Sequence, residues 1–148
     1  MIEGVQLHSL SIIGDERGQV LHMLKQRPDI LKAIGEVYFS KIYKGYVKAW
    51  KKHLKMTQRL VVPVGDVKFV LYDDRIDSNT YKQLQYVSLG VSNYQLLILP
   101  PNIWYGFQCI SDTDALIVNC PDLAHDATEV IRMDLDQNVI PHQWGVVQ

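Results

Sequence analysis

The chain has 148 residues, of which 47% are apolar and 21% charged, and its formal net charge at pH 7 is −1. This length and composition predict one soluble globular domain that covers residues 1–148. A charge so close to zero argues against a general nucleic-acid binder, and no apolar run approaches the roughly 20 residues that a membrane span needs.

Cysteine usage and the first residues bear on the cellular compartment. Cys109 and Cys120 are too few for a disulfide framework, and the segment that begins with Met1 shows neither the basic stretch nor the apolar core of a signal peptide. We therefore expect two buried thiols in a protein of the reducing cytoplasm.

The N-terminal segment has the pattern of extended structure. Residues 6–13 alternate moderately between apolar and polar side chains, which predicts an edge strand. The glycines and charges of residues 14–18 indicate a turn, after which residues 19–24 resume an extended pattern.

One helix is predicted next, over residues 25–35. Pro28 suits a first helical turn, Ile30 and Ile34 recur at helical spacing, and Gly35 is a typical helix end.

Short strands then follow one another with turn signals between them. The predicted strands are residues 37–43, 46–53, 59–64, 67–72, 83–89, 95–99, 107–110 and 115–119. Strands at this density, with little helix between them, predict an antiparallel sandwich or barrel. Residues 121–148 look irregular, and we expect Trp144 to pack back on the barrel.

The segment from Gly45 to Gly65 has the spacing G-x5-K-x-H-x4-Q-x6-G. It resembles the first cupin motif, G-x5-H-x-H-x4-E-x6-G, with Lys51 in the first His position and Gln58 in the Glu position. This resemblance implies a cupin-type jelly roll. Because side chains alternate along a strand, Lys51 and His53 should point to the same face.

A second stretch, which begins at Pro100, resembles the second cupin motif, P-x-G-x2-H-x3-N, with Tyr105 in the His position. Of the four ligand positions in a metal cupin, only His53 therefore keeps a metal-binding side chain. A lysine ammonium is a poor ligand, and one imidazole does not hold a divalent ion against water. We therefore expect a cupin without a metal ion.

Five segments together resemble the dTDP-4-dehydrorhamnose 3,5-epimerase family, and most closely its sugar-nucleotide epimerase-related branch. They are D-E-R-G at 15–18, G-Y-V-K-A-W-K-K-H at 45–53, G-D-V-K-F-V-L-Y-D-D-R at 65–75 with Ser78, L-P-P-N-I-W-Y-G-F at 99–107 and I-P-H-Q-W at 140–144. The resemblance implies proton abstraction next to the ketone of a dTDP-linked 4-keto-6-deoxyhexose. It implies no organic cofactor and no metal, because the ketone itself acidifies the neighbouring C–H.

The resemblance also implies binding residues and a homodimer. Arg17 and Lys48 match residues that contact the nucleotide diphosphate, and Trp50 lies between the matched positions of the central strand. Arg59 matches a lysine that faces the sugar oxyanion. Family members are homodimers in which the N-terminal strands cross to the neighbour, so Arg17 would complete the partner's site.

The departures from the family pattern fall on catalytic positions. Lys51 stands where the family has its histidine base, Tyr105 replaces a histidine, and Leu123 replaces an expected tyrosine. Ala49 and Asn102 replace glycines, and asparagine tolerates a positive φ at such a turn.

Several roles therefore remain open. The base is either Lys51, with its pKa lowered by burial and cationic neighbours, or His53. Lys51 alternatively supplies charge to a phosphate or an enolate, or faces solvent, and His53 alternatively packs within the barrel. Arg59 either stabilises the enolate or pairs with Asp73 or Asp74. Tyr105 either donates a proton or packs at the barrel mouth; Trp50 is either a ligand contact or part of the core.

Three functions follow, in order of preference. The first is a sugar-nucleotide epimerase or isomerase of surface-polysaccharide or deoxysugar biosynthesis. The second is a non-catalytic nucleotide-sugar binding protein with a degenerate site. The third is a metal cupin, such as a dioxygenase, that uses His53 with unexpected ligands.

Overall fold

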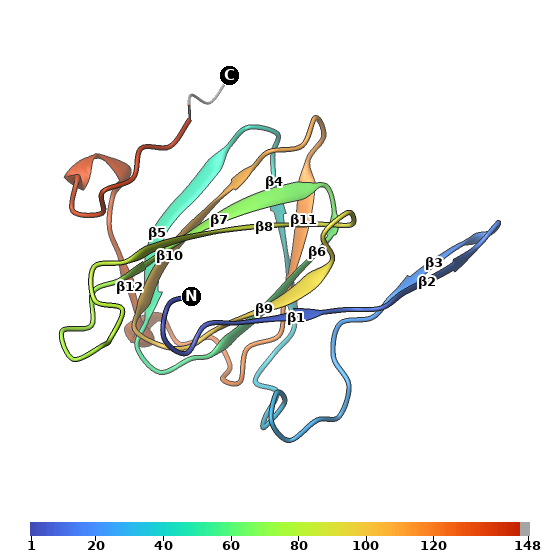
Figure 1. The fold of residues 1–148 in the computed structure, drawn as a ribbon, viewed down its shortest axis with the longest axis horizontal. Helices are drawn as coiled ribbons and strands as arrows, with labels where there is room; N and C mark the ends of the chain where they lie inside the picture. The colour runs from blue at the N-terminus through green and yellow to red at the C-terminus, as the bar shows by residue number, and fades with distance from the viewer. Residues whose placement is uncertain (146–148) are drawn as a thin grey trace.

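Two five-stranded antiparallel sheets face each other in the computed structural model, which describes residues 1–145 (Figure 1). The first sheet has the order β1 (Gln6–Ser9), β9 (Gln95–Leu99), β6 (Gln58–Val64), β11 (Ala115–Asn119) and β4 (Tyr38–Ile42). The second has the order β12 (Val130–Arg132), β5 (Val47–His53), β10 (Ile103–Cys109), β7 (Asp66–Asp73) and β8 (Leu84–Gly90). This arrangement confirms the predicted all-β, cupin-type jelly roll.

Strand alternation places the core between the two sheets. In β10, Ile103, Tyr105 and Phe107 point inward, while Trp104 belongs to a cluster on the outer face. The inner cluster takes apolar side chains from both sheets, including Phe69 of β7 and Ile117 of β11. Burial of these alternate side chains is the main force that holds the sheets together.

Most of the predicted strands are confirmed, with two differences in their bounds. Residues 6–13 form not one strand but two, β1 and the start of β2 (Ile12–Asp15). β10 begins at Ile103 rather than at residue 107, so it runs on through the second motif. Asn102, just before β10, has φ 64°, which confirms the left-handed turn predicted for it.

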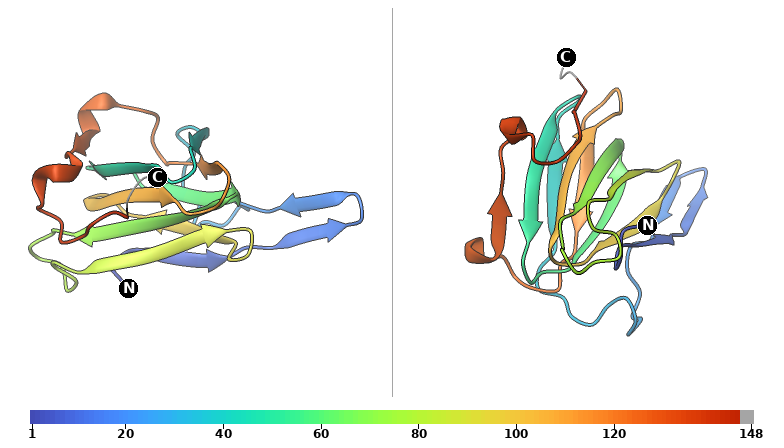
Figure 2. Two further views of the ribbon diagram at one scale, coloured as in Figure 1. Left: turned by 90° about the horizontal axis from the view of Figure 1, so that it is seen from above. Right: turned by 60° about the vertical axis from the view of Figure 1, so that its left-hand side comes forward.

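A hairpin of β2 and β3 (Gly18–Leu21) extends away from the barrel (Figures 1 and 2). Its apolar side chains Ile13 and Val20 are 61% and 59% exposed, so they bury little surface within the chain. The hairpin carries Arg17 at its turn, where the guanidinium pairs with Asp15.

The helix predicted for residues 25–35 is wrong. Only single turns close there, such as the bond from Leu31 N–H to the Arg27 carbonyl, and the segment wraps over the outer face of the first sheet. Ile30 is buried in a cluster on that face. Gly35 does not end a helix: its N–H bonds to Pro121, and a Cβ there would lie 1.9 Å from the Leu123 backbone.

The C-terminal segment is more regular than predicted. It contains β12, which pairs with the edge of β5, and two 3₁₀ turns, η1 (Ala127–Glu129) and η2 (Leu135–Gln137). Trp144 returns to the barrel as predicted, with its ring centroid 5.1 Å from that of Trp50. Within residues 1–145, none of the helical segments has the length and apolar character to cross a bilayer.

Candidate functional site

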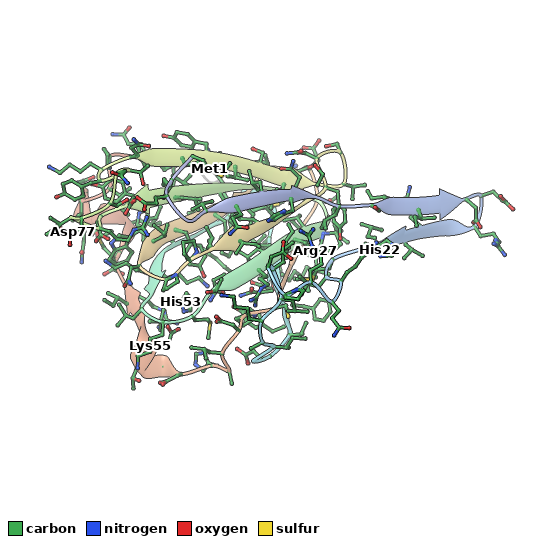
Figure 3. The ribbon with its side chains drawn as sticks, turned by 60° about the horizontal axis from the view of Figure 1, so that its bottom comes forward. Met1, His22, Arg27, His53, Lys55 and Asp77 are labelled. Atoms are coloured by element: carbon green, nitrogen blue, oxygen red, sulfur yellow. The ribbon has the colours of Figure 1, made fainter. Side chains whose placement is uncertain are left out.

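A cavity of about 360 Å³ opens between β4, the edge of the first sheet, and β5 with β12, the edge of the second. It is lined by Glu36, Tyr38, Lys51, His53, Met56, His125, Val130 and Arg132. This volume lies within the range of small-ligand sites. Figure 3 shows His53 at the end of β5, at the end of the barrel opposite His22 and the hairpin.

His53 and Glu129 form a buried pair beside this cavity. The imidazole Nδ1 bonds to the Glu129 Oε1, and the two side chains are 11% and 4% exposed. The second carboxylate oxygen of Glu129 accepts the backbone N–H groups of Leu54, Lys55 and Met56 at 3.2, 3.2 and 3.3 Å. The turn after β5 therefore holds the carboxylate, and the carboxylate orients the imidazole.

The protonation states of this pair follow from its surroundings. Burial lowers the pKa of His53 below its usual value, against the opposing effect of Glu129. Burial alone would raise the pKa of Glu129, but the hydrogen bonds from His53 and the backbone bring it below its usual value. At neutral pH the imidazole is thus neutral and donates Nδ1–H to the carboxylate, which leaves the lone pair on Nε2. Within the described residues Nε2 is buried and has no hydrogen-bond partner.

Lys51 is the second titratable group of the cavity. Its Nζ lies 5.2 Å from the ring centroid of Tyr105 and 5.8 Å from that of Phe107, so the ammonium sits among aromatic side chains of the barrel interior. Arg132 of β12 stands directly opposite Lys51 in the sheet register. Burial first, and then the charges of Arg132 and Lys48, lower the pKa of Lys51 to about 8.

Like charges opposite each other on neighbouring strands are destabilising. Between residues 1 and 145, no carboxylate forms an ion pair with Lys51 or Arg132. Lys51 and Arg132 thus have no ion-pair partner in the described chain, although Glu36 lines the same cavity, and such unpaired cations suit a site that receives an anionic or carbonyl-bearing ligand.

Tyr105 lies beside His53, on the neighbouring strand β10. The two rings are nearly parallel, at an interplanar angle of 25° with centroids 6.1 Å apart. Tyr105 is 2% exposed, and burial raises its pKa well above the usual value, so the phenol stays protonated. Its ring packs against the imidazole and supports its orientation.

Tyr38 of the first sheet lines the opposite wall, and a chain of polar side chains lies behind it. Asn119 Nδ2 donates to the Tyr38 hydroxyl at 2.8 Å and also to Gln58 Oε1. The Gln58 side chain is buried, and its Nε2 is a second buried polar atom without a partner among the described residues. An amide held in this way can donate to a ligand oxygen.

Two other buried nitrogens lack partners in the described part of the chain, and neither belongs to this cavity. They are His142 Nε2 and Trp144 Nε1, which lie with Trp50 on the outer face of the second sheet.

Arg59 does not face the cavity, which corrects the expectation that it stabilises an enolate. Its guanidinium bonds to the carbonyls of Ile30, Ala33 and Cys120, at 2.8, 3.4 and 3.3 Å, on the outer face of the first sheet. Alternation is the reason, since Leu60 points into the core and its neighbour must point out. Arg59 anchors the segment that was predicted to be helical.

Trp50 is likewise reassigned from ligand contact to packing. It is 4% exposed and belongs to the outer-face cluster with Val70 and Ile140, on the opposite side of β5 from His53.

The two predicted diphosphate contacts lie apart in one chain. Lys48 lies at the gap between the sheets, where its Nζ donates to the Lys41 carbonyl at 3.0 Å. Together with Lys51 and Arg132, it lines a further cavity of about 300 Å³. Arg17 is at the turn of the hairpin, away from both cavities (Figures 1 and 2).

Sequence reasoning missed Glu129, Arg132 and Asn119. The first two lie in the segment that looked irregular, although V-I-R at 130–132 has the alternation of a short strand. Metal-ligand candidates are also few: across residues 1–145, no three His, Cys, Asp or Glu side chains gather closely enough to hold an ion.

Comparison with known proteins agrees with the fold and identifies the family. Residues 1–147 match the family model described as dTDP-4-dehydrorhamnose 3,5-epimerase. The chain belongs to this epimerase family. The family predicted from the five segments is thereby confirmed.

Relatives of this family member include proteins of polysaccharide assembly. The probable low-salt glycan biosynthesis epimerase Agl13 of Haloferax volcanii is 32% identical over 143 residues, which cover 95% of this chain and 88% of that protein. The spore coat polysaccharide biosynthesis protein SpsL of Bacillus subtilis is 28% identical over 147 residues, with 98% and 97% covered.

Among solved structures, the dTDP sugar isomerase from Desulfovibrio desulfuricans G20 has a TM-score of 0.93 and 46% identity, with 97% of this chain and 92% of that chain covered. The dTDP-6-deoxy-D-glucose-3,5-epimerase RmlC of Legionella pneumophila, solved with dTDP-4-keto-L-rhamnose, has a TM-score of 0.84 and 20% identity, with 97% and 79% covered. Likeness at this lower identity shows the shared fold.

In this epimerase-family chain, only the second of the two histidines in the central-strand motif is kept. Lys51 occupies the first histidine position, and His53 occupies the second, two residues further along the same face of β5. There it meets a carboxylate, Glu129, that comes from the C-terminal segment.

Proposed function

We propose that this protein epimerises a dTDP-linked 4-keto-6-deoxyhexose at a carbon next to the ketone, with His53 as the general base. The observation that carries the proposal is the His53–Glu129 pair, in which Nδ1 is held by the carboxylate and Nε2 is free inside the barrel. A neutral imidazole fixed in this tautomer is suited to remove a proton. The relatives named for glycan biosynthesis and for spore coat polysaccharide biosynthesis support a role in the same kind of pathway.

The remaining cavity groups fit the charge that develops during such a reaction. Removing a proton beside a ketone places negative charge on the ketone oxygen. The ammonium of Lys51 lies beside His53 and lowers its pKa, so it is close enough to stabilise that charge electrostatically. Gln58 Nε2, which is buried and has no partner among residues 1–145, is a further hydrogen-bond donor behind Tyr38.

The diphosphate would lie in the further cavity next to the one that His53 lines. Lys48 and Arg132 are exposed cations that line this further cavity together with Lys51. Arginine and lysine there attract and bind phosphate oxygens.

A homodimer would bring Arg17 to the same ligand. The hairpin that carries Arg17 extends from the barrel with Ile13 and Val20 exposed, which fits a segment that packs on a second copy. Light scattering is expected to give twice the 17.0 kDa of one chain. A monomer would overturn this role of Arg17. The buried free thiols of Cys109 and Cys120 fit a cytoplasmic enzyme.

Solvent-hydrogen exchange tests the reaction. The protein is incubated with dTDP-4-keto-6-deoxyglucose in heavy water, and the C3 and C5 protons are followed by NMR against a control without protein. Loss of either signal faster than the control is expected, and it names the carbon. Broadened ligand signals without exchange would instead identify a non-catalytic binding protein, the second function considered.

A further inference from the structure

Epimerisation needs two groups on opposite sides of the sugar carbon: one removes the proton, and the other returns a proton to the other face. The base His53 and the expected donor Tyr105 lie on the same sheet, on neighbouring strands, with their rings nearly parallel and centroids 6.1 Å apart. A sugar cannot lie between rings that are already in contact. A donor for the other face must therefore come from the facing sheet.

Tyr38 is the phenol on that facing wall. It is on β4 of the first sheet and lines the same cavity as His53, which is on β5 of the second. Tyr38 and Ile42 share one face of β4, and Ile42 is in the inner core, so alternation directs Tyr38 inward.

The hydrogen bonds fix where the proton of Tyr38 lies. The Asn119 side chain is oriented by the backbone, since its Oδ1 accepts the Arg59 N–H at 3.1 Å. Its Nδ2 must then be the group that contacts the Tyr38 oxygen at 2.8 Å, and an amide NH₂ only donates. The Tyr38 oxygen is thus the acceptor in this bond. Its own O–H is not used there and is free to donate into the cavity.

The same geometry keeps Tyr38 in place. Asn119 is directly opposite Tyr38 in the pairing of β11 with β4 and is 1% exposed. Burial raises the pKa of Tyr38 above its usual value, so the phenol carries its proton at neutral pH.

We propose that Tyr38 is the proton donor to the sugar face opposite His53, with Asn119 as its positioning residue. In the reaction, His53 Nε2 takes the proton from the carbon, and the C–H electron pair forms the enolate. The enolate carbon then takes the proton of the Tyr38 hydroxyl from the other face. The resulting phenolate regains a proton from solvent and His53 releases the one it took, so the step is balanced without any oxidant or reductant. This inference rests on the proposed function.

The Tyr38→Phe variant separates removal of the proton from inversion. Because His53 alone can remove a proton and return deuterium to the same face, exchange at the sugar carbon in heavy water should persist. Formation of the epimer should fall by about 10²–10⁴-fold, the usual range for loss of a positioned acid or base. NMR of dTDP-4-keto-6-deoxyglucose in heavy water measures both quantities in one sample: loss of the proton signal, and appearance of the epimer.

Tyr94→Phe is the control: it changes a buried tyrosine on the outer face of the first sheet and should keep both exchange and inversion. Tyr105→Phe tests the competing donor: it keeps the ring that packs on the imidazole and removes only the phenol, so inversion would be lost if Tyr105 were the donor and kept if Tyr38 is. Thermal unfolding of each variant checks that the fold is retained.

The outcomes are distinct. Exchange without inversion in Tyr38→Phe, with inversion kept in Tyr105→Phe, supports the proposal. Three results would each overturn it. The first is epimer formation by Tyr38→Phe at the wild-type rate, and the second is loss of exchange as well as inversion in that variant. The third is loss of inversion in Tyr105→Phe but not in Tyr38→Phe. If the wild-type protein shows no exchange with this ketosugar, the proposed function fails, and the assignment of Tyr38 fails with it.

Discussion

Two buried carboxylates, Asp73 and Glu129, anchor two different regions of this molecule. Asp73, at the end of β7, accepts hydrogen bonds from the side chains of Arg75, Ser78 and Thr80 at 2.6–2.8 Å. The network fixes the 73–80 loop and ties it to Glu3 of the N-terminal segment. Glu129 instead orients His53, whose Nε2 is buried and has no partner among residues 1–145.

A structural network and a functional one differ in this fold in whether all of their buried polar groups have hydrogen-bond partners. A polar group that is buried without a partner costs free energy, so a protein normally completes its buried networks. The loop network is complete and contributes stability. The cavity is lined by His53, whose Nε2 has no partner in the described chain, and by Lys51, which has no carboxylate partner there. These are the groups that a ligand would satisfy.

The largest effect is expected from Glu129→Gln, which breaks the functional pair while keeping its shape. The glutamine NH₂ would donate to Nδ1 and force the imidazole proton onto Nε2, the atom that must accept the substrate proton. Removing an orienting carboxylate in this way costs orders of magnitude in rate, so we expect solvent exchange at the sugar to fall about 10³-fold. Exchange at the wild-type rate would show that Glu129 does not orient the base.

The next largest effect is expected from Asp73→Asn, the matched substitution in the structural network. It breaks a buried ion pair with Arg75, and we expect the free energy of unfolding to fall by about 3 kcal/mol with no change in exchange. Chemical denaturation and the exchange assay measure the two quantities. A loss of rate at unchanged stability would contradict the comparison.

The stabilisation by Asp73 should depend on pH. Burial alone would raise its pKa, but the hydrogen bonds from Arg75, Ser78 and Thr80 bring the pKa well below the usual value. A lowered carboxylate pKa stabilises the fold above the unfolded-state pKa, about 3.9, and this stabilisation is lost as the pH falls further. Asp73→Asn should therefore lose more stability at pH 7 than at pH 3.

The smallest effect concerns the pH profile and the charge of Lys51. Exchange should rise as His53 loses its proton, at a pH below its usual pKa, and fall above about pH 8 as Lys51 becomes neutral. The groups that face Lys51 are the cations Lys48 and Arg132, the ring of Tyr105 and the imidazole.

Lys51→Arg keeps the charge at all these pH values, so the alkaline fall should disappear while the rate near neutral pH changes only a few-fold. If the exchange rate of the wild type instead rises above pH 8, and Lys51→Arg shows no exchange, Lys51 is the base.

The sequence predicted the parts of this structure that depend on local pattern. Alternation located the strands, and it predicted that Lys51 and His53 share one face of β5. The structure agrees, since both side chains lie against the ring of Tyr105. The motifs predicted the jelly roll and the family. Asn102 was expected at positive φ from the chemistry of its turn alone.

Contacts between distant segments were not predictable in this way. The carbonyls of residues 30 and 33 accept hydrogen bonds from the Arg59 side chain of β6 rather than from N–H groups of a helix. The segment therefore is not helical, although its sequence has a helical pattern. Glu129 reaches His53 across 76 positions of sequence, and nothing local marks it as its partner. Likewise Tyr38 becomes a candidate donor only because β4 faces β5 across the cavity.

His53 is the proposed catalytic base of this epimerase-family chain. The most direct test compares solvent exchange of dTDP-4-keto-6-deoxyglucose by His53→Ala and by Lys51→Arg, with His142→Ala as the control histidine on the outer face. We expect His53→Ala to lose about 10³–10⁴-fold in exchange rate, while Lys51→Arg and His142→Ala keep theirs to within a few-fold. Exchange that survives in His53→Ala and is lost in Lys51→Arg would contradict the claim and return the base to the position that the family motif gives it.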